Sequence, residues 1–126
     1  MVYLLDANVI IRFLIGDNEE QLKQATKYFK EIEECGLEVE ILDSVIMEVY
    51  FVLIKFYKLD RVSVIQDIKS IIALDGVVNS DKVILYEALN IVENKNIDFV
   101  DALLCAKSNL QGYGILSFDK DLKKCK

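Results

Sequence analysis

Four short apolar runs, each followed or preceded by a longer amphipathic stretch, constrain the fold of this 126-residue chain more than any other feature. The runs span residues 2–5, 39–42, 77–78 and 115–117. Short, uniformly apolar runs are typical of parallel strands buried on both faces, and alternating helices supply the cover. We therefore expect one α/β domain over residues 1–126, with a short parallel sheet between helices.

The stretches outside the apolar runs carry helical periodicity and begin or end at capping residues. Asn8, Asp60 and Asp98 are suitable N-caps, while Gly16 and Gly112 are suitable C-terminal stops. The predicted helices span residues 8–15, 17–35, 43–58, 62–74, 81–92 and 99–111. Their ends carry an error of ~2–4 residues.

The absence of histidine narrows the possible chemistry more than any residue that is present. Without histidine, Ser-His-Asp and Cys-His catalysis and histidine-bound zinc are excluded. Carboxylates remain for acid–base or metal chemistry, and their oxygens suit Mg²⁺ or Mn²⁺. The net charge of −6 at pH 7 gives no general attraction to nucleic acid, so RNA or DNA binding would need a basic patch or bridging cations.

Cysteine usage and hydropathy predict a cytoplasmic, soluble protein. Cys35, Cys105 and Cys125 are odd in number and far apart, which favours reduced thiols, with Cys105 in the core. No apolar run approaches the ~18 residues that a membrane span needs. The N-terminus also lacks the pattern of a signal peptide.

Four carboxylates follow the predicted strands at positions that the topology would bring to one edge of the sheet. Asp6 follows the first run, Glu48 lies about one turn into the next predicted helix, and Asp119 follows the last run. Asp101 lies in the first turn of the helix at 99–111. Ligands of open α/β sheets bind at the carboxyl ends of strands, and clustered carboxylates need a compensating cation. The pattern predicts a divalent metal site.

Each of these acids also has a structural explanation. Asp6 could be a turn or capping residue, and Asp98-x-x-Asp101 resembles a capping box. Asp119 competes with Asp121 for one role, since either follows the last apolar run closely. Glu48 lies on a helix that is apolar nearly all round, so we expect it to be enclosed, where a lone carboxylate needs a partner or a metal. The alternative is that its polar stripe faces water.

Four segments, in order, resemble a PIN domain, and most closely the VapC-type toxin ribonucleases of toxin–antitoxin pairs. They are Leu5-Asp6-Ala7-Asn8, Glu48 within residues 44–49, Asp98-Phe99-Val100-Asp101-Ala102-Leu103-Leu104, and Leu116-Ser117-Phe118-Asp119-Lys120-Asp121. The resemblance implies a three-layer α/β/α sandwich with strand order 3-2-1-4, and a homodimer. Family members often add a final edge strand, and none is evident after Asp121.

The resemblance also implies Mg²⁺- or Mn²⁺-dependent cleavage of single-stranded RNA. Under it, the acidic quartet of the site comprises Asp6, Glu48, Asp101 and Asp119. Asn8, Ser117 and Asp98 would orient these carboxylates or bound waters. An antitoxin would be the protein partner, and one of its arginines could enter the acidic pocket.

Positive charge for RNA binding must come from a few side chains. Arg12, Lys55 and Lys120 lie near the predicted site in sequence, and a basic cluster closes the chain with Lys120, Lys123, Lys124 and Lys126.

Surplus apolar residues on the helices at 45–57 and 62–74 predict a dimer interface there.

Other functions remain open at this point. The chain could be a PIN nuclease of RNA processing without an antitoxin, or a nuclease-inactive PIN scaffold, although a retained quartet argues against the second. A flavodoxin-like ligand-binding module would need a Ser/Thr/Gly-rich phosphate loop after the first strand, and Asp6-Ala7-Asn8 is not one. A phosphorylation receiver domain would need paired acids near the N-terminus and a phosphoacceptor after a middle strand, and neither is evident.

Overall fold

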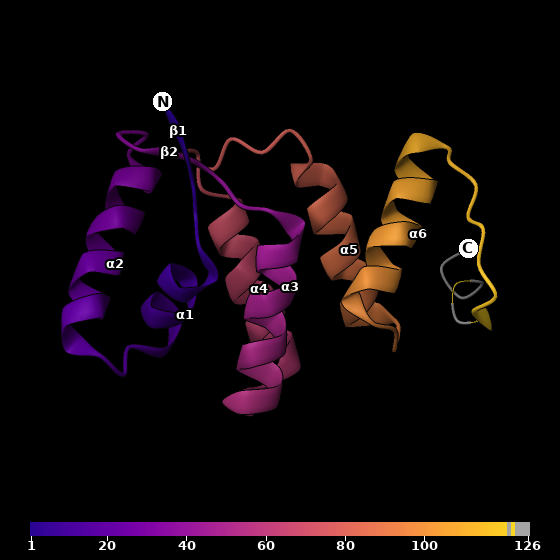
Figure 1. The fold of residues 1–126 in the computed structure, drawn as a ribbon, viewed down its shortest axis with the longest axis horizontal. Coiled ribbons are helices and arrows are strands. Elements are labelled where there is room, and N and C mark those ends of the chain that lie inside the picture. Colours follow the sequence, from indigo (N-terminus) through magenta and orange to yellow (C-terminus); the bar gives the residue numbers. More distant parts are fainter. Residues whose placement is uncertain (121, 123–126) are drawn as a thin grey trace. The chain divides into compact units, whose positions relative to one another are not determined.

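The structure is a computed structural model that describes residues 1–120 and 122 (Figure 1). Its backbone forms two compact units, Met1–Ser80 and Asp81–Lys126, and each is described by itself. Both units are rich in helix, and the first also contains a small parallel sheet. The fold is therefore helix-rich α/β, as expected, while the single domain remains a prediction.

The first unit alternates strands and helices in the predicted order. Its elements are β1 (Val2–Leu4), α1 (Ala7–Ile15), α2 (Glu19–Glu33), β2 (Glu38–Glu40), α3 (Asp43–Phe51), the π-helical turn η1 (Val52–Phe56) and α4 (Arg61–Ile72). β1 and β2 pair in parallel with Tyr3 opposite Val39, and Val39 also forms a parallel bridge with Val77. β2 thus lies between β1 and the extended segment at Val77.

The sheet is smaller and more open than the apolar runs predicted. Val39 in β2 is buried, but Val2, Tyr3 and Leu4 are all at least half exposed, so β1 is not covered on both faces. Residues 112–117 have no regular structure, so the strand predicted at 115–117 is not formed in the described chain. The full order 3-2-1-4 and the three-layer sandwich therefore remain predictions.

Apolar stripes of the four α-helices form the core of the first unit. α1 packs against α2 and α3, and α3 packs against α4. The stripes bury Ile10 and Ile11 of α1, Phe29 and Ile32 of α2, Ile46 and Val49 of α3, and Ile65, Ile68 and Ile72 of α4. In α2 and α4 this three-to-four-residue spacing is the periodicity from which the helix was predicted.

Gly76 lets the third extended segment reach β2. Its carbonyl oxygen accepts a hydrogen bond from Val39 N at 2.8 Å, and Val78 N donates to Val39 O at 2.8 Å. A methyl group at Gly76 would overlap the carbonyl oxygens of Ile32 and Leu37. Glycine is therefore required here by close backbone approach.

The second unit is built on two helices, α5 (Lys82–Asn94) and α6 (Phe99–Gln111), which pack against each other (Figure 1). The contact buries Leu85 and Leu89 of α5, with Phe99 and Ala102 of α6. α6 ends where the sequence predicted, at Gly112, whose φ of +70° is a left-handed conformation that glycine adopts without strain.

Two expectations about cysteine and membrane segments meet different outcomes. Cys105 is buried in α6, as predicted, but it takes part in a disulfide bond, so the prediction of a reduced thiol is wrong for this residue. Cys35 is a free, exposed cysteine, and Cys125 lies outside the described residues. Among the helices that the structure describes, none has the length and apolarity needed to cross a membrane.

Candidate active site

Two helices of the first unit begin at the same edge of the sheet. Leu4 and Glu40, the last residues of β1 and β2, lie opposite each other in the parallel register. α1 begins at Ala7 and α3 begins at Asp43, so both helices leave the carboxyl ends of their strands. This is the edge where open α/β sheets bind ligands.

Asn79 joins the third extended segment to this edge, and the sequence did not single it out. The side chain is buried, with Oδ1 accepting from Ile41 N at 2.8 Å and Nδ2 donating to Ile41 O at 2.6 Å. The amide thereby satisfies both backbone groups of the residue after β2. Its position directly after Val77 and Val78, where a predicted strand ends, was the sequence feature that could have drawn attention to Asn79.

Asp6 is the N-cap of α1. Its Oδ1 accepts a hydrogen bond from Ala7 N at 2.8 Å, so the capping explanation is confirmed and the predicted cap at Asn8 is wrong. Asn8 instead lies in the first turn of the helix and is exposed. Asp6 is also exposed, and the contact described for it uses Oδ1 and not Oδ2.

Glu48 is exposed, so the expectation of an enclosed carboxylate is wrong. α3 and η1 bury the stripe of Ile46, Val49 and Leu53, and Glu48 lies off that stripe. Apolar residues elsewhere on the helix, including Phe51, face water as well, so an apolar sequence did not mean burial all round. Because α1 packs against α3, the first unit carries Asp6 and Glu48 on neighbouring helices.

The second unit carries the other two predicted acids. Asp98 occupies the N-cap position of α6 without a side-chain capping bond, so the capping box is not formed. Asp101, in the first turn, is partly exposed. Asp119 is exposed, and its backbone N–H donates to Ser117 Oγ at 2.9 Å. The Ser117 hydroxyl therefore orders the backbone that carries Asp119.

Carboxylate oxygens are the donors that Mg²⁺ and Mn²⁺ prefer, so the chemistry of the predicted quartet fits either ion. In the described part of the chain, no group of three Asp, Glu or Cys side chains is arranged to hold a metal. Asp6 and Glu48 belong to the first unit, whereas Asp101 and Asp119 belong to the second. Convergence of the quartet therefore remains a prediction.

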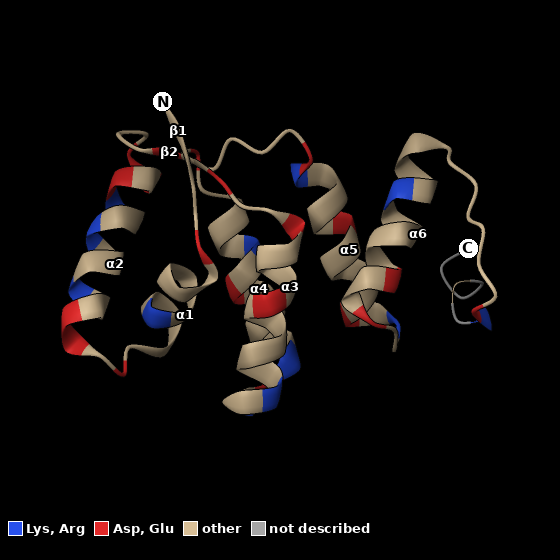
Figure 2. Cartoon of the chain, viewed as in Figure 1, with Lys and Arg blue, Asp and Glu red and all other residues tan. Residues whose placement is uncertain are grey.

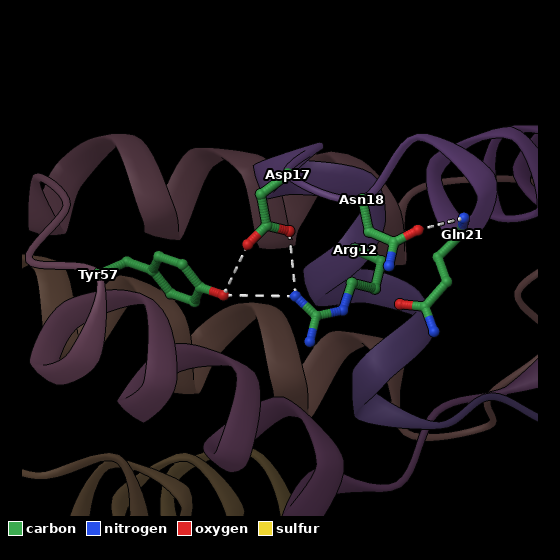
Figure 3. Close-up of polar contacts among 5 residues, drawn as sticks. All are labelled: Arg12, Asp17, Asn18, Gln21 and Tyr57. Carbon is green, nitrogen blue, oxygen red and sulfur yellow. Dashed lines mark hydrogen bonds and ion pairs between the residues drawn. The ribbon is translucent and has the colours of Figure 1, made fainter.

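Arg12, on α1 one turn beyond Asn8, is held in place by two other side chains (Figure 3). Its Nη1 lies 3.0 Å from Asp17 Oδ1 and 3.4 Å from the Tyr57 hydroxyl, which itself lies 3.4 Å from Asp17 Oδ2. The hydrogen bond to Tyr57, followed by the charge of Asp17, raises the pKa of Arg12. The guanidinium thus stays protonated, while the Asp17 carboxylate beside it offsets part of its charge.

The π-helical turn brings Tyr57 to this cluster. Tyr57 N donates to Val52 O at 3.1 Å, five residues back, so the last turn is wider than an α-helical one. The sequence had predicted a continuous α-helix over 43–58. Because the turn is wider, the Tyr57 side chain points in a different direction from the one it would have in that helix. Lys55 lies in the same turn and is exposed.

The basic residues predicted to bind RNA are dispersed in the described chain. Arg12 lies on α1 and Lys55 in η1, both in the first unit, whereas Lys120 belongs to the second. Figure 2 shows the basic residues of α2 in the middle of that helix, with acidic residues at both of its ends. Lys120 is exposed, whereas Lys123, Lys124 and Lys126 of the predicted basic tail, and Asp121, lie outside the described residues. Their role in binding remains a prediction.

Comparisons with known proteins cover nearly the whole chain. A family model described as "PIN domain" matches residues 3–126. A protein named "VapC ribonuclease" from Aquifex aeolicus (strain VF5) is 28% identical over 123 residues, covering 96% of this chain and 90% of that protein. No solved structure matches significantly. The match confirms the resemblance first suggested by the four acidic segments.

Proposed function

Because the chain belongs to the PIN domain family, we propose that it is a divalent-metal-dependent endoribonuclease that cleaves single-stranded RNA. The observation that carries the proposal is the similarity to a ribonuclease across 96% of the chain. The absence of histidine is consistent with it, since carboxylates with a metal can activate water without a histidine base.

In this proposal Asp6, Glu48, Asp101 and Asp119 hold Mg²⁺ or Mn²⁺. When bound, the ion supplies an activated water and stabilises charge on the phosphoryl oxygens. Asp6 and Glu48 are exposed carboxylates on packed helices, so both an ion and RNA can reach them. Asn8, Ser117 and Asp98 orient the carboxylates, in keeping with the bond between Ser117 Oγ and Asp119 N.

Positive side chains offset the charge of the RNA in this account. Lys55 and Lys120 are exposed and are proposed to contact phosphate groups. Arg12 contributes less as a charge, because Asp17 lies 3.0 Å from its Nη1. The four carboxylates would repel RNA until the metal enters, so binding of RNA and metal should be coupled.

We further propose that the protein is the toxin of a toxin–antitoxin pair. An antitoxin arginine entering the acidic pocket would pair with its carboxylates and prevent metal or RNA binding. The net charge of −6 favours such a basic partner. A PIN nuclease of RNA processing would share the chemistry but need no inhibitor.

A homodimer is proposed through α3, η1 and α4. Phe51 and Phe56 are 52% and 74% exposed, and Val62 at the start of α4 is 46% exposed. Exposed aromatic residues on adjacent packed elements are typical of a protein interface.

The proposed activity is tested with labelled single-stranded RNA. Purified protein should cleave it internally after Mg²⁺ or Mn²⁺ is added and should be inactive in EDTA, with activity restored by excess metal. Cleavage that persists in EDTA would contradict metal dependence. Failure to cleave any of a set of mixed-sequence RNAs in either metal would support the nuclease-inactive scaffold instead.

A further inference from the structure

A pocket of about 160 Å³, lined by both polar and apolar residues, lies between α1 and α2 and begins two residues after Asp6. Asn8 and Arg12 line it from α1, and Gln21, Gln24 and Tyr28 line it from α2. Three side-chain amides, a guanidinium and an aromatic ring therefore gather in one small space. Asn8, proposed above to orient a carboxylate, and Arg12 reach the pocket from α1, whereas Gln21, Gln24 and Tyr28 have no role in the proposed metal chemistry.

We propose that the pocket binds one nucleobase of the RNA substrate and gives the enzyme a base preference next to the cleavage site. This proposal rests on the proposed ribonuclease function and adds to it the group that the substrate inserts. Each amide offers both a donor and an acceptor, which is what the Watson–Crick edge of an unpaired base requires. Tyr28, at 36% exposure, offers a ring on which a base can stack.

The volume of the pocket is close to that of a cavity that holds a single ring. A cavity of ~150 Å³ accommodates one benzene ring. Val9 and the buried Ala25 add apolar surface for such a ring beside the polar groups. The geometry therefore favours a single-ring pyrimidine over a purine.

Arg12 enters the pocket with its charge partly offset. Both side-chain contacts described for it use Nη1, toward Asp17 and Tyr57 (Figure 3). Nε and Nη2 carry three further N–H donors. A guanidinium already paired with a carboxylate suits a neutral carbonyl oxygen, such as those of pyrimidines, better than a phosphate.

The α2 side of the pocket is fixed at the start of that helix. Asn18 caps it, with Oδ1 accepting from Gln21 N at 3.0 Å and the Asn18 carbonyl accepting from Leu22 N at 2.8 Å. On α1, Asn8 and Arg12 are four residues apart, a rise of about 6 Å that begins beside Asp6. The pocket is thus anchored on two capped helices adjacent to a proposed metal ligand.

The first test uses free nucleosides, which carry no phosphate and need no metal. Uridine or cytidine should shift the side-chain NH₂ resonances of Asn8, Gln21 and Gln24 in an NMR titration, and adenosine or guanosine should shift them less. No shift at millimolar nucleoside would overturn the proposal. Equal shifts with ribose 5-phosphate would also overturn it, because that compound lacks a base.

The second test measures cleavage of RNAs that differ in a single base. Gln24→Ala should weaken discrimination about fivefold, and Tyr28→Ala should raise KM roughly tenfold while Tyr28→Phe restores it. Gln111→Ala, an exposed glutamine at the end of α6, is the matched control and should change neither. If wild-type protein cleaves RNA but these variants keep its KM and base preference, the base pocket is wrong and the ribonuclease stands. If these variants bind an antitoxin peptide more weakly than the wild type does, and cleave RNA as the wild type does, the pocket binds protein and not a base.

Discussion

The Asn79 side chain hydrogen-bonds to both backbone groups of Ile41, at 2.8 Å to its N–H and 2.6 Å to its C=O. Ile41 directly follows β2 and precedes α3, the helix that carries Glu48. The pair therefore fixes how the chain leaves the sheet toward a proposed site residue. It also replaces ladder hydrogen bonds that a longer third strand would have made.

Replacing Asn79 with alanine should lower the free energy of unfolding by about 2–4 kcal/mol, because two buried backbone groups would lose their partners. Urea denaturation followed by circular dichroism measures this. Asn96→Ala, at an exposed asparagine after α5, is the control and should change the free energy by less than about 0.5 kcal/mol. A similar small change for both variants would show that water replaces the Asn79 amide.

Replacing Asp17 with asparagine should strengthen the salt dependence of RNA binding. Arg12 would lose the carboxylate that lies 3.0 Å from Nη1 and could then contact phosphate. The slope of log K against log salt should steepen by up to about 0.7 for one extra phosphate contact on single-stranded RNA. Asp75→Asn, at an exposed aspartate that is not among the described contacts of Arg12, controls for the change in net charge. Equal slopes for the two variants would mean that Arg12 does not reach the RNA backbone.

Changing Lys120, Lys123 and Lys124 together to alanine should reduce the salt slope of RNA binding. If all three contact phosphates, the slope should fall by about 2, with base preference unchanged. Fluorescence anisotropy at several salt concentrations measures it. An unaltered slope would leave Lys55, Arg12 and the metal to bind the backbone, and would make the tail a solvated terminus.

Light scattering should give a mass near twice the 14.4 kDa of the chain at micromolar concentration. Phe56→Asp should shift the protein to the monomer, since Phe56 is 74% exposed and its charged replacement would be buried in the proposed interface. Val83→Asp, at an exposed valine of α5, is the matched control. A wild-type mass of 14.4 kDa would remove the dimer.

Helix positions were the most predictable part of the fold, because most predicted helices had a periodic apolar stripe, a capping residue or a glycine stop. Gly16 and Gly112 end α1 and α6 as predicted, and both adopt φ of +70°. The π-helical turn after Phe51 was not predictable from the same pattern, since one wider turn hardly alters apolar spacing over so short a stretch.

The solvent exposure of individual side chains was harder to predict than the positions of the helices. The helix around Glu48 is apolar on most sides, yet Glu48 and Phe51 are both exposed. Periodicity identifies which residues can be buried but not how many neighbouring elements cover them. Asp98 illustrates a related limit: the capping pattern is present in sequence, but its side chain makes no capping bond. The disulfide at Cys105 escaped notice because an odd number of distant cysteines favours free thiols.

The acidic positions followed from topology alone, since each comes shortly after a predicted strand or at a helix start. Asp6 proves to be the N-cap of α1, and Glu48 lies on α3, which packs against α1. Asn79 was missed because a single asparagine after two valines gives no sign of its buried partner at Ile41.

The central claim is that the four carboxylates bind the catalytic metal, and it is tested most directly by cleavage of single-stranded RNA in Mg²⁺ by Asp6→Asn, Glu48→Gln and Asp101→Asn. Each should lose more than about 100-fold in rate, because even residues behind metal ligands typically cost 10–100-fold. Asp119→Asn should lose less, as an outer carboxylate acting through water. Asp75→Asn should retain wild-type activity, and metal-free melting temperatures should hold or rise in the quartet variants as repulsion is relieved. Wild-type rates in Asp6→Asn, with the fold intact, would contradict the assignment.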